Sequence, residues 1–225
     1  MRFRIDLKIF IFLILFYLTN QIEIYTIIMC FAIIHELGHF LVGLVLGFKP
    51  NKIEINPFGI SIGFKINLMD YNKKIKKANI IEIKKIIVAI AGPMINLLII
   101  FIVSILNINI YEKTIMIYSN LLLFLFNILP IYPLDGSRIL KGVLHIIYGK
   151  SKSYKYIYNI SFFSLIILTA ISSIAVLYFK NIAIFLVIIF LWVLHNKEDK
   201  IYQRSMKIYE IMEDELRNNK REKIV

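Results

Sequence analysis

Long apolar blocks alternate with short polar, lysine-rich segments along this chain. The blocks cover residues 5–18, 22–46, 86–106, 114–131, 157–179 and 182–194. A helix that crosses a bilayer needs about 20 mostly apolar residues, whereas a helix of a soluble domain shows apolar residues on one face only. We therefore expect an all-α polytopic membrane protein with about six transmembrane helices.

Basic residues indicate how these helices are oriented. They precede the first block, fill the segments after the second and fourth blocks, and follow the sixth, whereas the intervening loops carry only Lys113 and Lys180. Because cytoplasmic loops are enriched in Lys and Arg, this distribution places both termini in the cytoplasm of a multi-pass cell-membrane protein. The segment after Leu18 lacks the small-x-small pattern of a signal-peptide cleavage site, so we interpret block 5–18 as an uncleaved span.

Composition supports a membrane protein and excludes a nucleic-acid-binding one. Hydrophobic residues make up 59% of the 225 residues and charged residues 19%, a balance seldom found in soluble domains. The formal net charge of +12 could suggest a nucleic-acid partner. However, the positive residues lie in loops beside apolar blocks rather than on one basic face. The lipid bilayer is therefore the expected partner.

Two segments outside the apolar blocks have a character of their own. Within 52–67, apolar residues alternate with others after a turn-like Asn56-Pro57-Phe58-Gly59, which predicts a small cytoplasmic-side β-hairpin, with an irregular loop as the alternative. Residues 196–225 are highly charged and predict a cytoplasmic tail containing an amphipathic helix. Residues 1–195 would form one membrane-embedded domain.

The sequence His35-Glu36-Leu37-Gly38-His39 in the second block is the strongest chemical signal. Positions four apart share a helix face, so both imidazoles can bind one metal ion, and Glu36 can reach a water molecule beside it. The alternative is a pair of interfacial histidines. His35 lies near the middle of the block, where ionisable side chains are expensive unless they are paired or bind a metal. The pattern therefore predicts a zinc site, because zinc keeps an open coordination position and activates water.

A catalytic zinc usually has a third protein ligand. His145 and His195 follow apolar blocks and are interpreted as polar boundary residues. Asp135 stands in Asn127-Ile-Leu-Pro-Ile-Tyr-Pro-Leu-Asp-Gly136, where two prolines and a glycine forbid a regular helix. Such a broken backbone could turn Asp135 inward to the metal, or it could form an ordinary turn at the membrane surface. Local chemistry leaves both open.

Spans two to four resemble the site-2 protease family of intramembrane zinc metalloproteases. The chain has that family's HExxH, its later Asn...Pro...Asp-Gly motif, and Ala91-Gly92-Pro93-Met94-Ile95-Asn96, which is similar to its Gly-Pro-x-x-Asn element. The resemblance implies a three-helix metalloprotease core, with His35, His39 and Asp135 as ligands of one Zn²⁺ and Glu36 as catalytic base. Extra spans around such a core resemble the stage IV sporulation protein FB type.

Two asparagines are candidates for substrate binding. Asn127 resembles the asparagine of the family's Asp-Gly motif, which implies that it holds substrate or polarises its carbonyl. For Asn96, a substrate role and a packing role between helices have equal weight, because polar side chains often hydrogen-bond across transmembrane helices.

The function expected from these features is hydrolysis of a peptide bond in or beside a transmembrane segment. The partners would be a membrane-tethered protein substrate, such as a pro-sigma or anti-sigma factor, and regulatory membrane proteins. The alternative is an intramembrane metal or proton transporter, because buried His and Asp also mark ion pathways. A catalytically silent membrane chaperone is disfavoured by the intact Glu36.

Overall fold

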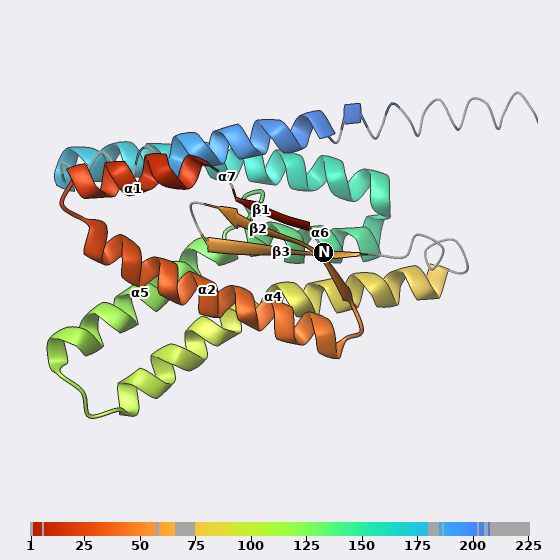
Figure 1. Ribbon diagram of the computed structural model, residues 1–225. Coiled ribbons are helices and arrows are strands. Elements are labelled where there is room, and N and C mark those ends of the chain that lie inside the picture. Colours follow the sequence, from red (N-terminus) through yellow and green to blue (C-terminus); the bar gives the residue numbers. More distant parts are fainter. Residues whose placement is uncertain are drawn as a thin grey trace, which may run out of the picture.

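Helices dominate the structure, a computed structural model that describes residues 2–5, 7–56, 59–65, 75–179, 185, 187–201, 203–204 and 207 (Figure 1). The elements in chain order are β1 (Arg2–Ile5), α1 (Lys8–Leu18), α2 (Ile22–Val45), β2 (Lys49–Asn56), β3 (Gly59–Lys65), α4 (Ile75–Ile105), α5 (Ile110–Ile128), α6 (Asp135–Tyr148) and α7 (Lys150–Phe179). Residues 187–201 are also helical.

Three helices among the described residues are long and apolar enough to cross a membrane: Ile22–Val45, Asn79–Ile105 and Lys152–Tyr178. They support a membrane protein, but the expected count of six is not confirmed. The 11 residues of α1 extend only about 16 Å as a helix, against a hydrocarbon core of about 30 Å. Helix α5 starts with Glu112 and Lys113 inside its first two turns. The block 182–194 lies partly outside the described residues.

A three-stranded sheet replaces the simple hairpin expected from the sequence. Strands β2 and β3 pair antiparallel, which confirms the hairpin; Pro57, Phe58 and residues 66–67 lie outside the described residues. The third strand was not expected: β1 pairs parallel with β2, with Arg2 opposite Lys52. Ile5 therefore belongs to a strand and not to the first apolar helix. A pairing between segments 50 residues apart leaves no local pattern in either of them.

Helix α4 organises the bundle by packing against α2, α5 and α6, while β3 packs against α2 and α6 against α7. Figure 1 shows α2 and α4 crossing, with α5 running back from the end of α4. Small residues permit close approach. A Cβ added to Gly38 of α2 would lie 2.6 Å from Cγ1 of Ile95 on α4, and one added to Gly43 would overlap the ring of Phe64 on β3.

The helical path breaks after Ile128, as the two prolines predict, and resumes at Asp135. Ile131 in the break is fully buried and clusters with Leu165 of α7 and Leu191 of the last helix. Helix α6 was not anticipated as a separate element. It lies between the expected apolar blocks 114–131 and 157–179, in one of the segments that contain basic residues. The break therefore turns the chain so that Asp135 is the first residue of a new helix.

Candidate metal centre

Helix α2 carries two buried imidazoles one turn apart. His35 and His39 are each only 3% exposed, and their ring centroids lie 4.8 Å apart in an edge-on arrangement. Large apolar residues of the same helix, among them Ile34, Leu37 and Leu41, are exposed, so the two imidazoles lie on the face of α2 that packs inside the bundle. The spacing of four residues thus produces the shared helix face that the sequence predicts.

Asp135 reaches the same point from the start of α6. Its carboxylate Oδ2 lies 3.0 Å from Nε2 of His35 and 3.0 Å from Nε2 of His39, while the two Nε2 atoms lie 3.1 Å apart. The other carboxylate oxygen, Oδ1, accepts a hydrogen bond of 3.3 Å from Nη1 of Arg138. Of the two interpretations left open for Asp135, the inward-facing one is therefore observed.

The donor atoms of the cluster, their spacing and their surroundings fit a zinc ion. Two imidazole nitrogens and one carboxylate oxygen are a zinc donor set, and potential ligand atoms of the three residues lie within 4.8 Å of one another. His39 Nδ1 lies 2.7 Å from the carbonyl oxygen of Val88; because a carbonyl can only accept, Nδ1 carries the hydrogen and Nε2 keeps its lone pair. Gly92 lies beside the cluster, and a Cβ there would lie 2.5 Å from Nε2 of His35.

Asn96 lies against the far side of His35. It is fully buried, and its Nδ2 lies 3.0 Å from Nδ1 of His35, while its Oδ1 has no hydrogen-bond partner. The two ends of an amide are assigned from the hydrogen bonds around them. When the amide is turned over, Oδ1 accepts a hydrogen bond from Nδ1–H, which leaves Nε2 free to bind a metal. This contact gives Asn96 a role in orienting His35 that the sequence did not reveal.

The Asn96 contact yields a prediction about metal affinity. We expect Asn96→Ala to weaken zinc binding about 10-fold, because loss of the outer hydrogen bond to a ligating histidine typically costs 10- to 100-fold. Competition with a chromogenic chelator measures the affinity. Asn120→Ala is the matched control, since Asn120 is also fully buried but donates to the Met116 carbonyl of its own helix. An unchanged zinc affinity in Asn96→Ala would contradict this role.

The other two candidate residues, Glu36 and Asn127, differ in their surroundings. Glu36 is partly buried and lies within the electrostatic influence of His39, Arg138 and Asp135. Asn127 is also partly buried, but its Nδ2 donates to the Leu123 carbonyl of its own helix at 3.0 Å. Glu36 thus directly follows a cluster residue in the chain, whereas the Asn127 side chain is hydrogen-bonded back to its own helix α5.

Neither of the remaining histidines joins the cluster. His145 Nδ1 lies 3.7 Å from Oε1 of buried Glu82. His195 is 2% exposed and is therefore packed among other side chains at the end of its apolar block. Its Nδ1 lies within hydrogen-bond distance of the Ser161 hydroxyl, and the sequence carries no sign of that contact because a single serine in an apolar helix is an ordinary residue.

Three comparisons with known proteins bear on this geometry. The sequence model described as Peptidase family M50 matches residues 107–171, which contain α5, the break and Asp135. A zinc metalloprotease of Methanocaldococcus jannaschii is 35% identical over 139 residues, covering 57% of this chain and 36% of that protein.

The structure is also similar to the solved structure of a site-2 protease from Methanocaldococcus jannaschii. The TM-score is 0.62 at 27% identity, with 86% of this chain and 88% of that chain covered. The chain is therefore similar in sequence to peptidase family M50 and to a zinc metalloprotease, and in structure to a site-2 protease, and zinc is the metal that its cluster of His35, His39 and Asp135 fits.

Proposed function

We propose that this protein is an intramembrane zinc metalloprotease that hydrolyses a peptide bond within or beside a transmembrane segment of its substrate. The observation that carries the proposal is the convergence of one carboxylate oxygen, from the start of α6, with two imidazole nitrogens of α2. Helix α2 is apolar enough to span a membrane, and in it Glu36 directly follows His35. Three ionisable groups at such depth are expensive unless they serve a metal or a pathway.

The chemistry divides between the metal and the side chains. A zinc ion held by His35, His39 and Asp135 supplies Lewis acidity and lowers the pKa of a water molecule. Glu36 accepts a proton from the attacking water as its oxygen bonds to the scissile carbonyl carbon. Glu36 then delivers that proton to the amide nitrogen as the C–N bond breaks, which yields one carboxylate and one amine. Asn127 assists by hydrogen bonding to the carbonyl, after release from Leu123.

Strand β3 is suited to hold the substrate. A helical substrate hides its amides in internal hydrogen bonds and must unwind before it can be cut. Among the described strands, β3 pairs only with β2, so its other edge offers N–H and C=O groups to an added strand. Phe64 of β3 lies against Gly43 of α2, one helical turn beyond His39. An unwound segment paired with β3 would therefore lie near the metal centre.

The substrate we propose is a membrane-tethered regulator, such as a pro-sigma or anti-sigma factor, which cleavage releases from the membrane. In this proposal the protease is a multi-pass protein of the cell membrane, and both of its termini lie in the cytoplasm. Six spans and the stage IV sporulation protein FB type are part of this proposal. They rest on the distribution of basic loop residues and on the motifs of the sequence. The chain matches only 36% of the length of its curated relative.

Metal removal tests the proposal directly. We expect the purified protein, reconstituted with a candidate membrane-tethered substrate, to lose cleavage when zinc is removed with 1,10-phenanthroline and to regain it when zinc is restored. Electrophoresis of the shortened product measures the reaction. Cleavage that persists after zinc has been removed, verified by metal analysis, would contradict the assignment.

The transporter alternative makes a different prediction for the same vesicles. A transporter needs several polar sites along a route, whereas the described residues contain one group of three metal-binding side chains. Uptake of zinc or protons into proteoliposomes without any cleaved product would favour the transporter. Uptake measurements on the same preparation that cleaves substrate therefore distinguish the two functions.

A further inference from the structure

The segment that presents Asp135 makes few backbone hydrogen bonds to the rest of the fold. Between α5 and α6, Ile131 N–H and Leu134 N–H donate to carbonyls within the segment, at 2.8 Å each. Pro130 and Pro133 have no N–H to donate. Tyr132 N–H is different, because it donates to the hydroxyl of Ser161 on α7 at 2.9 Å. This bond connects the break to a neighbouring helix.

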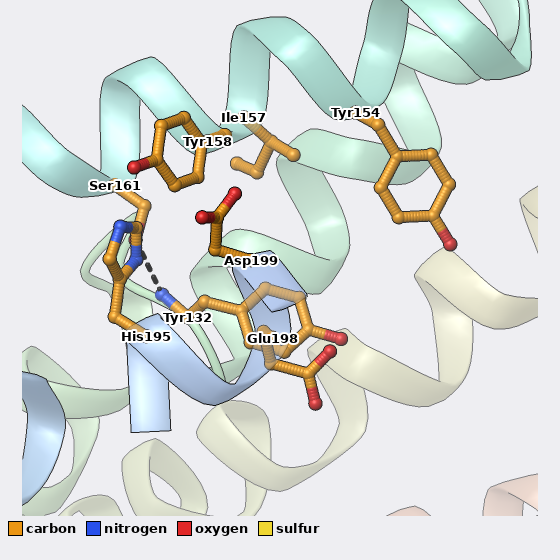
Figure 2. A pocket seen from close by; sticks show the side chains of 8 residues that line it. All are labelled: Tyr132, Tyr154, Ile157, Tyr158, Ser161, His195, Glu198 and Asp199. Atoms are coloured by element: carbon orange, nitrogen blue, oxygen red, sulfur yellow. Dashed lines mark hydrogen bonds between the residues drawn. The ribbon is translucent and has the colours of Figure 1, made fainter. Parts of the chain in front are cut away.

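Ser161 is in turn held by His195 of the last helix. Ser161 Oγ lies 3.1 Å from Nδ1 of His195, and both residues are at least 98% buried. The imidazole stacks on the ring of Tyr158, with centroids 5.0 Å apart. Figure 2 shows the imidazole, Ser161 and the Tyr132 backbone nitrogen converging at one end of a pocket. A polar pair at such depth is stable only when its partners are in place.

The hydrogen bond between Ser161 and His195 lies in a buried environment. Burial lowers the pKa of His195 below its ordinary value of about 6.5, although nearby Asp199 opposes the shift. The ring is therefore neutral at neutral pH, so Nδ1 and the hydroxyl form a bond between uncharged groups. Ile131, next to Tyr132 in the chain, forms an apolar cluster with Leu165 and Leu191, which lie one helical turn from Ser161 and His195.

We propose that Ser161 and His195 are positioning residues for the metal centre: they fix the Tyr132 amide and thereby the placement of Asp135, three residues later. Asp135 must meet two imidazoles at once, at 3.0 Å each. Side chains that bind a metal have to be held to within about 0.5 Å of the productive geometry. This inference rests on the proposed function only in that it assumes the cluster binds zinc.

Four variants test the inference in the full-length protein in detergent micelles. Ser161→Ala and His195→Leu remove the contact, and both should lose zinc to a chelator about 10-fold faster than wild type. After cobalt is substituted for zinc, their d–d absorption bands should shift, because the Asp135 carboxylate is displaced. His195→Asn, which keeps a polar atom near the position of Nδ1, should recover most of the wild-type behaviour.

Thr169→Val is the fourth, matched variant. It removes the acceptor of Trp192 Nε1, a 3.0 Å hydrogen bond between the same two helices that does not touch the break. Its melting temperature should fall as in Ser161→Ala, but zinc release and the cobalt spectrum should stay at wild-type values. Equal zinc loss in Thr169→Val, or unchanged zinc release in Ser161→Ala and His195→Leu, would overturn the inference.

These readouts separate the inference from the proposed function. A wild-type protein that binds zinc through the cluster but cleaves no membrane substrate contradicts the protease and leaves the positioning role intact. A protein that cleaves substrate at unchanged rates and retains zinc after Ser161→Ala contradicts the positioning role alone.

Discussion

Glu36→Gln is expected to abolish proteolysis while the zinc content stays at the wild-type level. The substitution keeps the size of the side chain and removes its ability to accept a proton at neutral pH. General acid–base catalysis contributes about 10²- to 10⁴-fold to hydrolytic rates, and in the proposed mechanism one residue serves in both proton transfers. Glu36 is not among the three residues that meet at the metal centre, so metal binding should not change.

The measurement combines two assays on one preparation: formation of the shortened substrate and metal content by mass spectrometry. Glu23→Gln is the control, because Glu23 is an exposed residue in the first turn of the same helix; it should change neither quantity. Cleavage that survives in zinc-loaded Glu36→Gln, free of contaminating protease, would refute the role of Glu36. Loss of zinc together with cleavage would instead make Glu36 part of the metal site.

Gly92→Ala is expected to abolish both zinc binding and cleavage through one added methyl group. The new Cβ would overlap Nε2 of His39 and lie 2.5 Å from Nε2 of His35. These are the atoms that face Asp135, so the methyl group would occupy the position that the ion needs. Alanine is favoured over glycine in a helix by about 1 kcal/mol. The expected loss is therefore steric and local and does not reflect a weaker helix.

Gly142→Ala provides the matched control for this steric argument. Its Cβ would lie 2.5 Å from Cγ1 of Ile86, a side chain that can move, and 3.8 Å from the nearest backbone atom. It crowds the α4–α6 interface, whereas Gly92 lies at the contact of α4 with α2, and its nearest neighbours include no imidazole. We expect Gly142→Ala to lower thermal stability while retaining zinc. A Gly92→Ala protein that binds zinc with wild-type affinity would contradict the site as described.

The sequence predicted those parts of the molecule that local chemistry determines. The expected span 22–46 coincides with α2 (Ile22–Val45) because its apolar run is bounded by polar or turn-forming residues at both ends. The two prolines before Asp135 predicted the break between α5 and α6. The histidine spacing predicted the shared face of α2, although local chemistry alone could not decide whether Asp135 faces inward.

Features that depend on distant partners could not be predicted in the same way. Strand β1 continues into the apolar sequence of α1, and only its pairing with β2 makes it a strand. Ser161 belongs to an apolar helix and gains its role from a backbone amide 29 residues earlier in the chain. Asn96 was assigned equal packing and substrate roles, because the contact with His35 spans 61 residues.

The separation of the metal-binding residues along the chain has a consequence for biogenesis. Asp135 follows His35 by 100 residues, so α2 enters the membrane long before its carboxylate partner has been synthesised. The apolar residues of α2, whose mean hydropathy is 1.9, must therefore offset the cost of inserting two imidazoles and a glutamate into lipid before Asp135 is present. Metal capture therefore awaits the docking of α6, and a metal that binds only the docked state stabilises that state. Zinc supply during synthesis should accordingly influence how much protein reaches its mature topology.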